Sequence, residues 1–274
     1  MKLLRNFLRL MVHMRQMIKD MLSKRGVGLG VLIAFGLAGC GPAPIASGIN
    51  DPMEAQNREI HDFNLAVDRA VLKPVSKLLG EGKPGPVSKG ISHLANTLDA
   101  PSHVANNLLQ LRLADAAENT LRFGVNVIFG FGGLLDPATD MGLYGKPTDF
   151  GETLHVWGVP EGAYTVVPLV GPSTDRDLAG LVVGKALNPL RFLLKSPKRE
   201  AAAVIGLGAM AGNRAAYSET VDSILYDSAD GYAQARLLYL QNRRHTLARG
   251  KQAEGEGLDA SDTYIDPYED PYGN

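Results

Sequence analysis

The chain has one cysteine, Cys40, and its position constrains the class of protein more than any other feature of the sequence. The basic pair Lys24-Arg25 precedes an apolar run, Val27–Leu37, and the small residues Ala38-Gly39 lead directly into the cysteine. Basic residues, then roughly 7–15 apolar residues, then small residues at a cleavage point are the layout of an export signal. We therefore predict that residues 1–39 are removed and that Cys40 becomes a lipid-bearing first residue.

The apolar run is bounded well short of the roughly 20 residues that a membrane-spanning helix needs. A spanning anchor is therefore not expected. Residues 1–20 are basic, amphipathic and longer than the usual start of an export signal, so we expect the true start at Met21, with Met11, Met14 and Met17 as alternatives. A basic helix that binds a membrane surface is the other interpretation of this segment.

A single cysteine also excludes a disulfide within the chain and a cysteine zinc cluster. Cleavage after residue 39 removes seven Lys/Arg and one acid, which leaves 21 basic and 28 acidic residues and a formal charge of −7. Nucleic acid is thus not expected as a partner. No cofactor is expected besides the diacylglycerol and the fatty acyl chain attached to Cys40.

The spacing of apolar residues predicts an all-α protein. Asp51 is predicted to cap the first helix, with Pro52 at its first position and Glu54 completing a capping box, and the helix is expected to run until Pro74 interrupts it. Further helices are expected over 87–98, from Pro101 through Leu111, from Asp115 through Ile128, over 176–194, over 201–212, and in two last segments around 217–225 and 232–243.

Two segments are rich in glycine and proline yet apolar. Residues 130–151 are too apolar for a solvated loop, and 154–173 continue in the same style, either as a buried connector or as a lipid-facing one. The segment 176–194 is apolar on almost every side, which fits a helix that is either buried or exposed to lipid. The small residues of 201–212 favour close helix–helix approach.

Four parts follow from this pattern. They are an export signal (1–39), a lipidated tether (40–50), one helical domain (51–248) and a disordered acidic tail (249–274) with seven acids against two basic residues.

Enzyme motifs are absent from the sequence. There is no Gly-x-Ser-x-Gly nucleophile elbow and no His-Glu-x-x-His. The glycines at 180 and 184 before Lys185 lie one residue too close for a phosphate loop, and no Ser or Thr follows them. The five histidines after residue 40 are scattered, so neither a metal site nor catalysis is expected.

Short, specific strings of residues occur across most of residues 51–246. In chain order they are Asp51-Pro52-Met53-Glu54 with Asn57-Arg58; Asn106-Asn107-Leu108-Leu109-Gln110; Arg122-Phe123 with Asn126; Gly130-Phe131-Gly132-Gly133-Leu134-Leu135-Asp136; Asp149-Phe150-Gly151-Glu152-Thr153-Leu154; Trp157-Gly158; Gly162-Ala163-Tyr164; Gly171-Pro172-Ser173 with Arg176-Asp177; and Tyr239-Leu240-Gln241-Asn242-Arg243. These strings, in this order, resemble those of the MlaA (VacJ) family of outer-membrane lipoproteins.

The resemblance implies a single helical, ring-shaped domain that lies in the inner leaflet of the outer membrane, lipid-anchored on the periplasmic side. It implies that phospholipids misplaced in the outer leaflet pass through the domain to a periplasmic lipid-carrier protein, and that the domain associates with an outer-membrane porin trimer. Removal of these lipids would maintain the lipid asymmetry of the outer membrane without covalent chemistry.

A diacyl lipid needs an apolar wall for its chains and a polar route for its headgroup. The candidates for the lipid passage are Phe123, Gly130, Phe131, Gly132, Gly133, Leu134, Trp157 and Tyr164, and the candidates for headgroup contact are Arg122, Lys146, Arg176 and Lys185. Two other functions remain as alternatives: a structural lipoprotein that only braces porins, and a lipoprotein lipid hydrolase.

Overall fold

The computed structural model describes residues 42–80, 85–190, 194, 196 and 198–252. The predicted export signal, the lipid acceptor Cys40 and the tail beyond Gln252 lie outside the described residues. What the sequence predicts for them stays a prediction.

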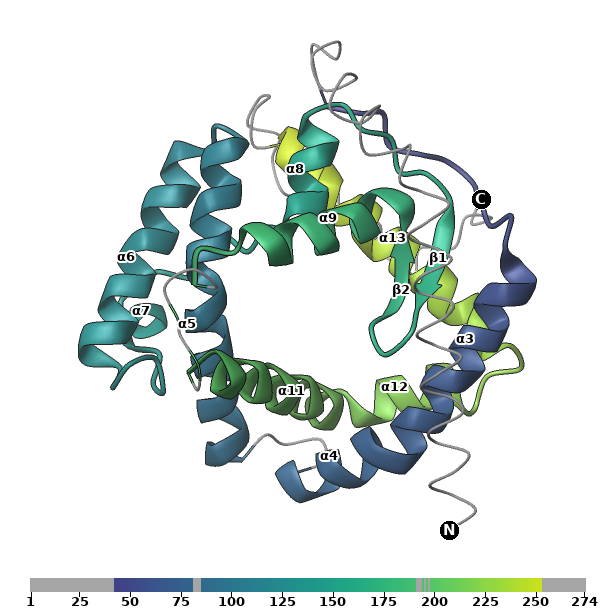
Figure 1. The fold of residues 1–274 in the computed structure, drawn as a ribbon, viewed down its shortest axis with the longest axis horizontal. Helices are drawn as coiled ribbons and strands as arrows, with labels where there is room; N and C mark the ends of the chain where they lie inside the picture. The colour runs from purple at the N-terminus through teal and green to yellow at the C-terminus, as the bar shows by residue number, and fades with distance from the viewer. Residues whose placement is uncertain (1–41, 81–84, 191–193, 195, 197, 253–274) are drawn as a thin grey trace, which may run out of the picture.

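The described chain is mostly helical, as predicted. Its elements, in order, are α3 (Glu54–Val67), η1 (Asp68–Leu72), α4 (Lys73–Leu79), α5 (Pro86–Leu109), α6 (Leu113–Phe129), α7 (Pro137–Asp140), α8 (Phe150–Val156), β1 (Tyr164–Val167), β2 (Gly171–Thr174), α9 (Asp175–Leu187), α11 (Lys198–Ala216), α12 (Ser218–Leu225) and α13 (Gly231–Gln252). Seen down the shortest axis, they form a ring: the chain goes once around it from α3 to the strands, α9 then runs back toward α5, and α11 and α12 return along the opposite edge to α13 (Figure 1).

Figure 1 places α5 and α6 on one side of this ring and α3, the two strands and α13 on the other. The helices α9 and α11 run between these sides along opposite edges. Among the described residues, no helix is both long enough and apolar enough to cross a membrane.

The prolines do not end helices where the sequence predicts. Pro101 lies inside α5, so the two helices expected over 87–98 and 101–111 are one helix of 24 residues. Pro74 falls in the first turn of α4, where a missing backbone N–H costs little, and a π-helical turn joins α3 to α4. Both predicted breaks were wrong, because the backbone stays helical through Pro74 and Pro101.

The start and end of the domain also differ from prediction. Met53, not Asp51, precedes the first helical residue, and the Asp51 carboxylate instead accepts hydrogen bonds from Asn57, Tyr232 and Arg236. Residues 249–252, which the sequence assigns to the disordered tail, continue helix α13.

An antiparallel hairpin interrupts the helical fold within the segment 154–173. Tyr164 pairs with Thr174 and Val167 with Gly171. The side chains of Tyr164 and Val166 lie in the core with Tyr232 and Leu240 of α13, whereas Leu169 at the turn is 52% exposed. The segment is therefore a buried connector at its strands and an exposed one at its turn.

The small residues of α11 allow it to pack closely on α5, as the sequence predicts. A Cβ at Gly212 would lie 2.8 Å from the Ser88 hydroxyl oxygen, and a Cβ at Gly208 would lie 3.1 Å from Ile91. Ala211 and Ala215 are fully buried on the same helix. This contact fixes the lower edge of the ring in Figure 1 to its α5 side.

Helix α13 joins distant parts of the chain through arginines. Its ion pairs are Arg236 with Asp51 and Glu54, Arg243 with Asp149 and Asp177, and Arg244 with Glu161. A further pair joins Arg58 of α3 to Asp230, just before α13 begins. One helix thus contacts the start of the domain, α8, α9 and the residues before the hairpin.

Candidate functional site

A cavity of about 410 Å³ lies where four helices meet. Its walls come from α5, from the start of α8, from one face of α9 and from α13. The residues that line it are Asp99, Ser102, His103, Asn106, Thr148, Asp149, Phe150, Asp177, Gly180, Leu181, Gly184, Lys185, Asn188, Tyr239 and Arg243. This volume lies within the range of pockets that hold small ligands.

Two glycines bring α8 and α9 together at this cavity. A Cβ at Gly180 would lie 2.3 Å from the backbone nitrogen of Gly151, and a Cβ at Gly151 would lie 2.6 Å from the Asp177 carboxylate. Asp149 begins α8 as its N-cap and accepts a hydrogen bond of 2.8 Å from the Glu152 amide. The backbones can touch only because neither glycine carries a side chain.

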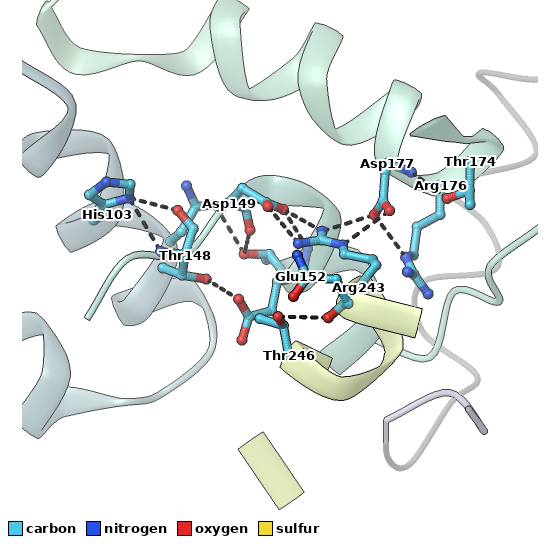
Figure 2. Close-up of polar contacts among 12 residues, drawn as sticks. His103, Thr148, Asp149, Glu152, Thr174, Arg176, Asp177, Arg243 and Thr246 are labelled. Atoms are coloured by element: carbon cyan, nitrogen blue, oxygen red, sulfur yellow. Dashed lines mark hydrogen bonds and ion pairs between the residues drawn. The ribbon is translucent and has the colours of Figure 1, made fainter. Parts of the chain in front are cut away.

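Arg243 of α13 lies between two carboxylates, as Figure 2 shows. Its Nη1 and Nη2 donate to Asp149 at 2.8 Å each, and its Nε and Nη2 donate to Asp177 at 3.0 and 2.9 Å. Tyr239 donates a further hydrogen bond to Asp177 at 2.7 Å. Burial alone would raise the pKa of Asp177, but the Arg243 charge and these donors hold that pKa below its ordinary value.

A buried polar network supports the cavity from behind α8. Glu152 is 5% exposed and accepts from Arg112 at 2.6 Å and from the Thr148 hydroxyl at 2.8 Å. Gln110 donates to Thr148 and Thr153 at 2.8 and 2.9 Å. These hydrogen bonds join the end of α5 and the start of α6 to α8. The contact is therefore made by buried, hydrogen-bonded polar side chains rather than by apolar packing.

Asp99 is the carboxylate of the cavity without a cation. Arg243 neutralises Asp149 and Asp177, but among the described residues none donates a hydrogen bond to Asp99. Burial raises the pKa of the Asp99 carboxyl, and only the charge of His103, one turn along α5, opposes that rise. The His103 Nδ1 lies 2.7 Å from the Thr148 carbonyl oxygen and 3.3 Å from the Thr148 amide nitrogen, so the tautomer of the ring decides which of these groups it bonds.

The outside of the molecule is unusually apolar on α6 and the turns that flank it. We call this the α6 outer surface; it comprises Leu111, Leu113, Leu121, Ile128, Phe129 and Phe131, which are 59–84% exposed. The opposite face of α6 buries the polar residues Asn119 and Asn126. A contiguous apolar surface of this kind marks contact with a membrane or a partner.

The four predicted headgroup residues do not come together. Lys185 lines the cavity, and Lys146 is exposed. Arg122 donates to Asp136 at 2.6 Å, to Thr139 and to the Leu143 carbonyl, so it holds the glycine-rich segment. Arg176 is buried and paired with its neighbour Asp177.

The residues predicted for a lipid passage are also dispersed. Phe131, Leu134 and Trp157 are exposed, as is Gly132, whereas Gly130 and Gly133 are buried and Phe123 is partly buried. Gly133 has a φ of +100° and sits where a Cβ would collide with Thr97. Tyr164 is 1% exposed and belongs to the core, so its ring does not line open space. None of these residues lines the cavity.

Sequence reasoning did not single out Asp99, His103, Asp149, Asp177 or Arg243 as site residues. Three of them stand in the strings that carry the resemblance, Asp149 before Phe150-Gly151, Asp177 after Arg176, and Arg243 at the end. The signal that could have predicted an ion-pair network was the presence of two acidic residues and one arginine in three of these strings. Asp99 does not stand in any of these strings, and no residue pattern around it indicates a site.

The arrangement can bind a ligand with charged and polar groups. Among the described residues, no group of three or more His, Cys, Asp or Glu side chains is placed to hold a metal ion. The cavity is lined by the Asp99 carboxylate, by the neutralised Asp149 and Asp177, and by hydroxyl and amide groups.

Comparison with known proteins finds a family model and full-length relatives that match this chain. The family model described as MlaA lipoprotein matches residues 49–246. The intermembrane phospholipid transport system lipoprotein of Haemophilus influenzae is 32% identical over 233 residues, which cover 82% of this chain and 92% of that protein. The lipoprotein of the same name from Escherichia coli K12 is 30% identical, with 82% and 88% covered.

A solved structure shares the fold as well. It was described under the words "Structural basis for maintenance of bacterial outer membrane lipid asymmetry" and superposes with a TM-score of 0.61 at 29% identity. The match covers 72% of this chain and 98% of that one.

Proposed function

The chain belongs to the MlaA lipoprotein family, and we propose that it removes misplaced phospholipid from the outer leaflet of the outer membrane and passes it inward. The relatives are lipoproteins of an intermembrane phospholipid transport system. The direction of transfer, the lipid anchor at Cys40 and the acceptor of the lipid are part of the proposal.

One observation carries this proposal: polarity is inverted on the α6 side of the molecule. The α6 outer surface exposes large apolar side chains, while the inward face of the same helix buries asparagines. A protein surrounded by water gains free energy from the reverse arrangement. A protein that sits among acyl chains gains from an apolar outside and keeps polar groups for its interior.

The mixed polar and apolar lining of the cavity supports a lipid substrate. A phospholipid that leaves a bilayer must exchange the hydration of its charged headgroup for other polar partners, since an unpaired charge in an apolar medium is costly. Hydroxyl, amide and charged side chains line the cavity, and the exposed apolar side chains lie outside it. The proposed transfer needs no covalent step.

We place the domain partly in the inner leaflet of the outer membrane, on its periplasmic side. The acyl chains on Cys40 hold it there, because each buried methylene contributes about 0.8 kcal/mol. An outer-membrane porin trimer is the proposed neighbour of its apolar outside, and a periplasmic lipid-carrier protein is the proposed acceptor.

Deletion of the gene tests the function directly. We expect the mutant cells to carry more phospholipid in the outer leaflet, measured by chemical labelling of surface amines, and to be more sensitive to detergent. The wild-type chain supplied in trans should restore both, and a chain with Cys40→Ala, which cannot be lipidated, should not. Unchanged outer-leaflet phospholipid in the deletion would contradict the proposal, and co-purification of the chain with a porin from wild-type cells would then favour a structural role.

Hydrolysis is separated from transfer by a second measurement. Purified protein incubated with phospholipid vesicles should release no fatty acid above the rate of buffer alone. Fatty acid release that depends on the protein would instead favour a lipid hydrolase.

A further inference from the structure

An apolar groove of about 280 Å³ lies between α12 and α13, where α13 also contacts β2. We call it the α12–α13 groove. Among the described residues that line it, none carries a charge, and the polar ones are Tyr239 and Asn242. The others are aliphatic side chains of β2, α12 and α13, namely Pro172, Val221, Ile224, Leu225, Ala235 and Leu238. Such a lining matches an uncharged, apolar occupant.

Tyr239 belongs to this groove and to the charged cavity between α5, α8, α9 and α13. Its hydroxyl donates to Asp177 at 2.7 Å on the cavity side, where Asp149 and Arg243 also lie. One side chain thus separates an uncharged hollow from a charged one. A phospholipid has the same division, between its uncharged acyl chains and its charged headgroup. Of these two parts, only an acyl chain matches the groove, since an unpaired charge among aliphatic side chains is costly.

The groove has room for a slender part of a ligand. Pockets that enclose a whole small molecule measure roughly 300–1,000 Å³, and the groove is slightly smaller than these. It is also open to the outside, because Leu238 lines it and is still 51% exposed. A chain can therefore enter from the side while the rest of a larger molecule stays outside.

The hairpin turn that leads into the groove contains a strained residue. Leu169 has a φ of +66°, a left-handed backbone that leucine rarely adopts. Asn64 on α3 fixes the turn, because its Nδ2 donates to the Val167 carbonyl oxygen at 3.1 Å and its Oδ1 accepts from the Leu169 N–H at 2.7 Å. Leu169 and Val170 are both exposed just before Pro172 of the groove, and Figure 1 shows the turn directed toward α12. A strained turn that exposes apolar side chains beside an apolar groove indicates a ligand contact.

We propose that the α12–α13 groove binds an acyl chain of the transported phospholipid, and that the exposed hairpin turn extends this apolar contact. The inference rests on the proposed function, because it names the part of the lipid that this groove takes. Leu238 at the open side and Leu169 at the turn are the side chains that the chain would cover. Covering them removes apolar surface from water, which supplies the binding free energy.

Photolabelling tests where the chain lies. The lipidated full-length protein, purified in mild detergent, is incubated with phosphatidylglycerol that carries a diazirine near the end of one acyl chain. After illumination, the residues that carry adducts are identified by peptide mass spectrometry. We expect adducts on the groove residues of α12 and α13. Adducts confined to the α6 outer surface would overturn the inference, whereas phospholipid transfer, which is measured in cells, would still stand.

Two neighbouring leucines of α13 provide a matched pair of variants. Leu238 lines the groove and is 51% exposed, whereas Leu237 is 45% exposed and is not among the residues that line it. Leu238→Gln should lower the adduct yield on the groove about fivefold, because one apolar contact with the chain is lost. Leu237→Gln should leave the yield unchanged. Equal yields from the two folded variants would overturn the assignment of the chain to this groove.

The turn is tested by a variant that suits its backbone. Asparagine adopts the left-handed region more readily than leucine, so Leu169→Asn removes the apolar side chain and should unfold close to the wild-type temperature. The adduct yield on the groove should nevertheless fall about twofold. Leu78→Asn, which removes an exposed leucine of α4 outside the groove, should leave the yield unchanged. A folded Leu169→Asn protein with the wild-type yield would overturn the contribution of the turn.

Two further arms leave the groove residues unchanged. When the diazirine is attached to the headgroup, adducts on the groove should be nearly absent; a yield equal to that of the acyl-chain probe would overturn the assignment to an acyl chain. The acyl chains that we predict on Cys40 are another source of the same chemistry. The Cys40→Ala protein, which lacks them, should keep the wild-type adduct yield. A severalfold rise would mean that the protein's own chains occupy the groove, and would overturn its assignment to the transported lipid.

Discussion

The two sides of the ring are built on opposite principles. On the α13 side, Tyr164, Val166, Tyr232 and Leu240 form an apolar core, and arginines close the structure at its margins. On the α6 side, the apolar residues are outside and hydrogen-bonded polar side chains are inside. The first side is organised like a water-soluble protein, whereas the second has the arrangement that the proposed contact with lipid would favour.

The largest effect should come from breaking the charge network on the α13 side. Arg243→Met leaves Asp177, whose side chain is 9% exposed, with only the longer Arg176 contact at 3.3 Å as a cation. Removal of one partner from a buried ion pair costs about 3–5 kcal/mol. Denaturant unfolding in mild detergent should show this loss. The control is Arg69→Met, since Arg69 is exposed and stacks on the Tyr226 ring. A similar loss of unfolding free energy there would mean that the buried network contributes no more than an exposed cation.

Acid should weaken the same network through Asp177. The Arg243 charge and the hydrogen bonds outweigh burial and lower the pKa of Asp177, so its ionised form stabilises the folded state above the ordinary carboxyl pKa of 3.8, and this contribution is lost as the pH falls through the lowered value. At pH 7 Asp177→Asn should therefore be less stable than the wild type. The difference should shrink as the pH is lowered from 5 toward 3. A difference that grows on acidification would reverse the assigned sign.

On the α6 side, a buried polar side chain should contribute to the free energy of unfolding as a buried apolar side chain does in an apolar core. Asn126 is 4% exposed, accepts from the Ala138 amide at 3.1 Å and donates to Asp136 at 2.8 Å. Asn126→Leu leaves both groups without this partner and should cost about 1–3 kcal/mol of unfolding free energy. Thr120→Leu on the exposed face of α6 should change it by less than about 0.5 kcal/mol. A stabilised Asn126→Leu protein would show that this interior is an ordinary apolar core.

Membrane affinity should distinguish the outsides of the two sides. Leu121→Lys with Ile128→Lys places two charges on the α6 outer surface, where both residues are now exposed and apolar. In a chain with Cys40→Ala, vesicle binding should fall about tenfold or more, since a charge within a bilayer costs up to about 3 kcal/mol. Leu237→Lys on α13, where the leucine is 45% exposed, should leave binding nearly unchanged. Equal losses for both would mean that the membrane contact is not confined to α6.

The smallest effect concerns a glycine of α6. A Cβ at Gly124 meets nothing within 4 Å, so Gly124→Ala should stabilise the helix by about 0.5–1 kcal/mol. Gly180→Ala is the contrasting variant, since its Cβ would collide with the Gly151 backbone. The thermal unfolding temperature should rise for the first and fall for the second. A fall for both would indicate an unrecognised contact on the outside of α6.

Helical periodicity located most of the helices, because it depends on local spacing alone. It could not show which side of a helix faces outward. Leu113, Leu121 and Ile128 recur on α6 as core residues would, and only their neighbours in space reveal that they are exposed. The hairpin was missed because its two strands have four residues each and sit among glycines and prolines.

The candidate site was harder to predict for a different reason. Asp149, Asp177 and Arg243 meet across 66 and 94 residues of sequence, and no spacing rule connects them. The predicted cations were chosen as isolated charges in apolar segments, and this criterion selected both Lys185, which lines the cavity, and Arg122, whose partners are internal. Whether a charged side chain faces a cavity or holds the fold together can be decided only when its ion-pair partners are known.

The arginines of α13 also set an order of events during biosynthesis. The acidic residues that they neutralise belong to segments made much earlier, from Asp51 to Asp177, whereas the helix itself comes near the end of the described chain. Until α13 is available, Asp51, Asp149 and Glu161 lack the arginines that pair with them in the folded domain. The last helix therefore acts as a checkpoint, and a chain interrupted before residue 231 should remain open to proteases rather than persist as a partial ring.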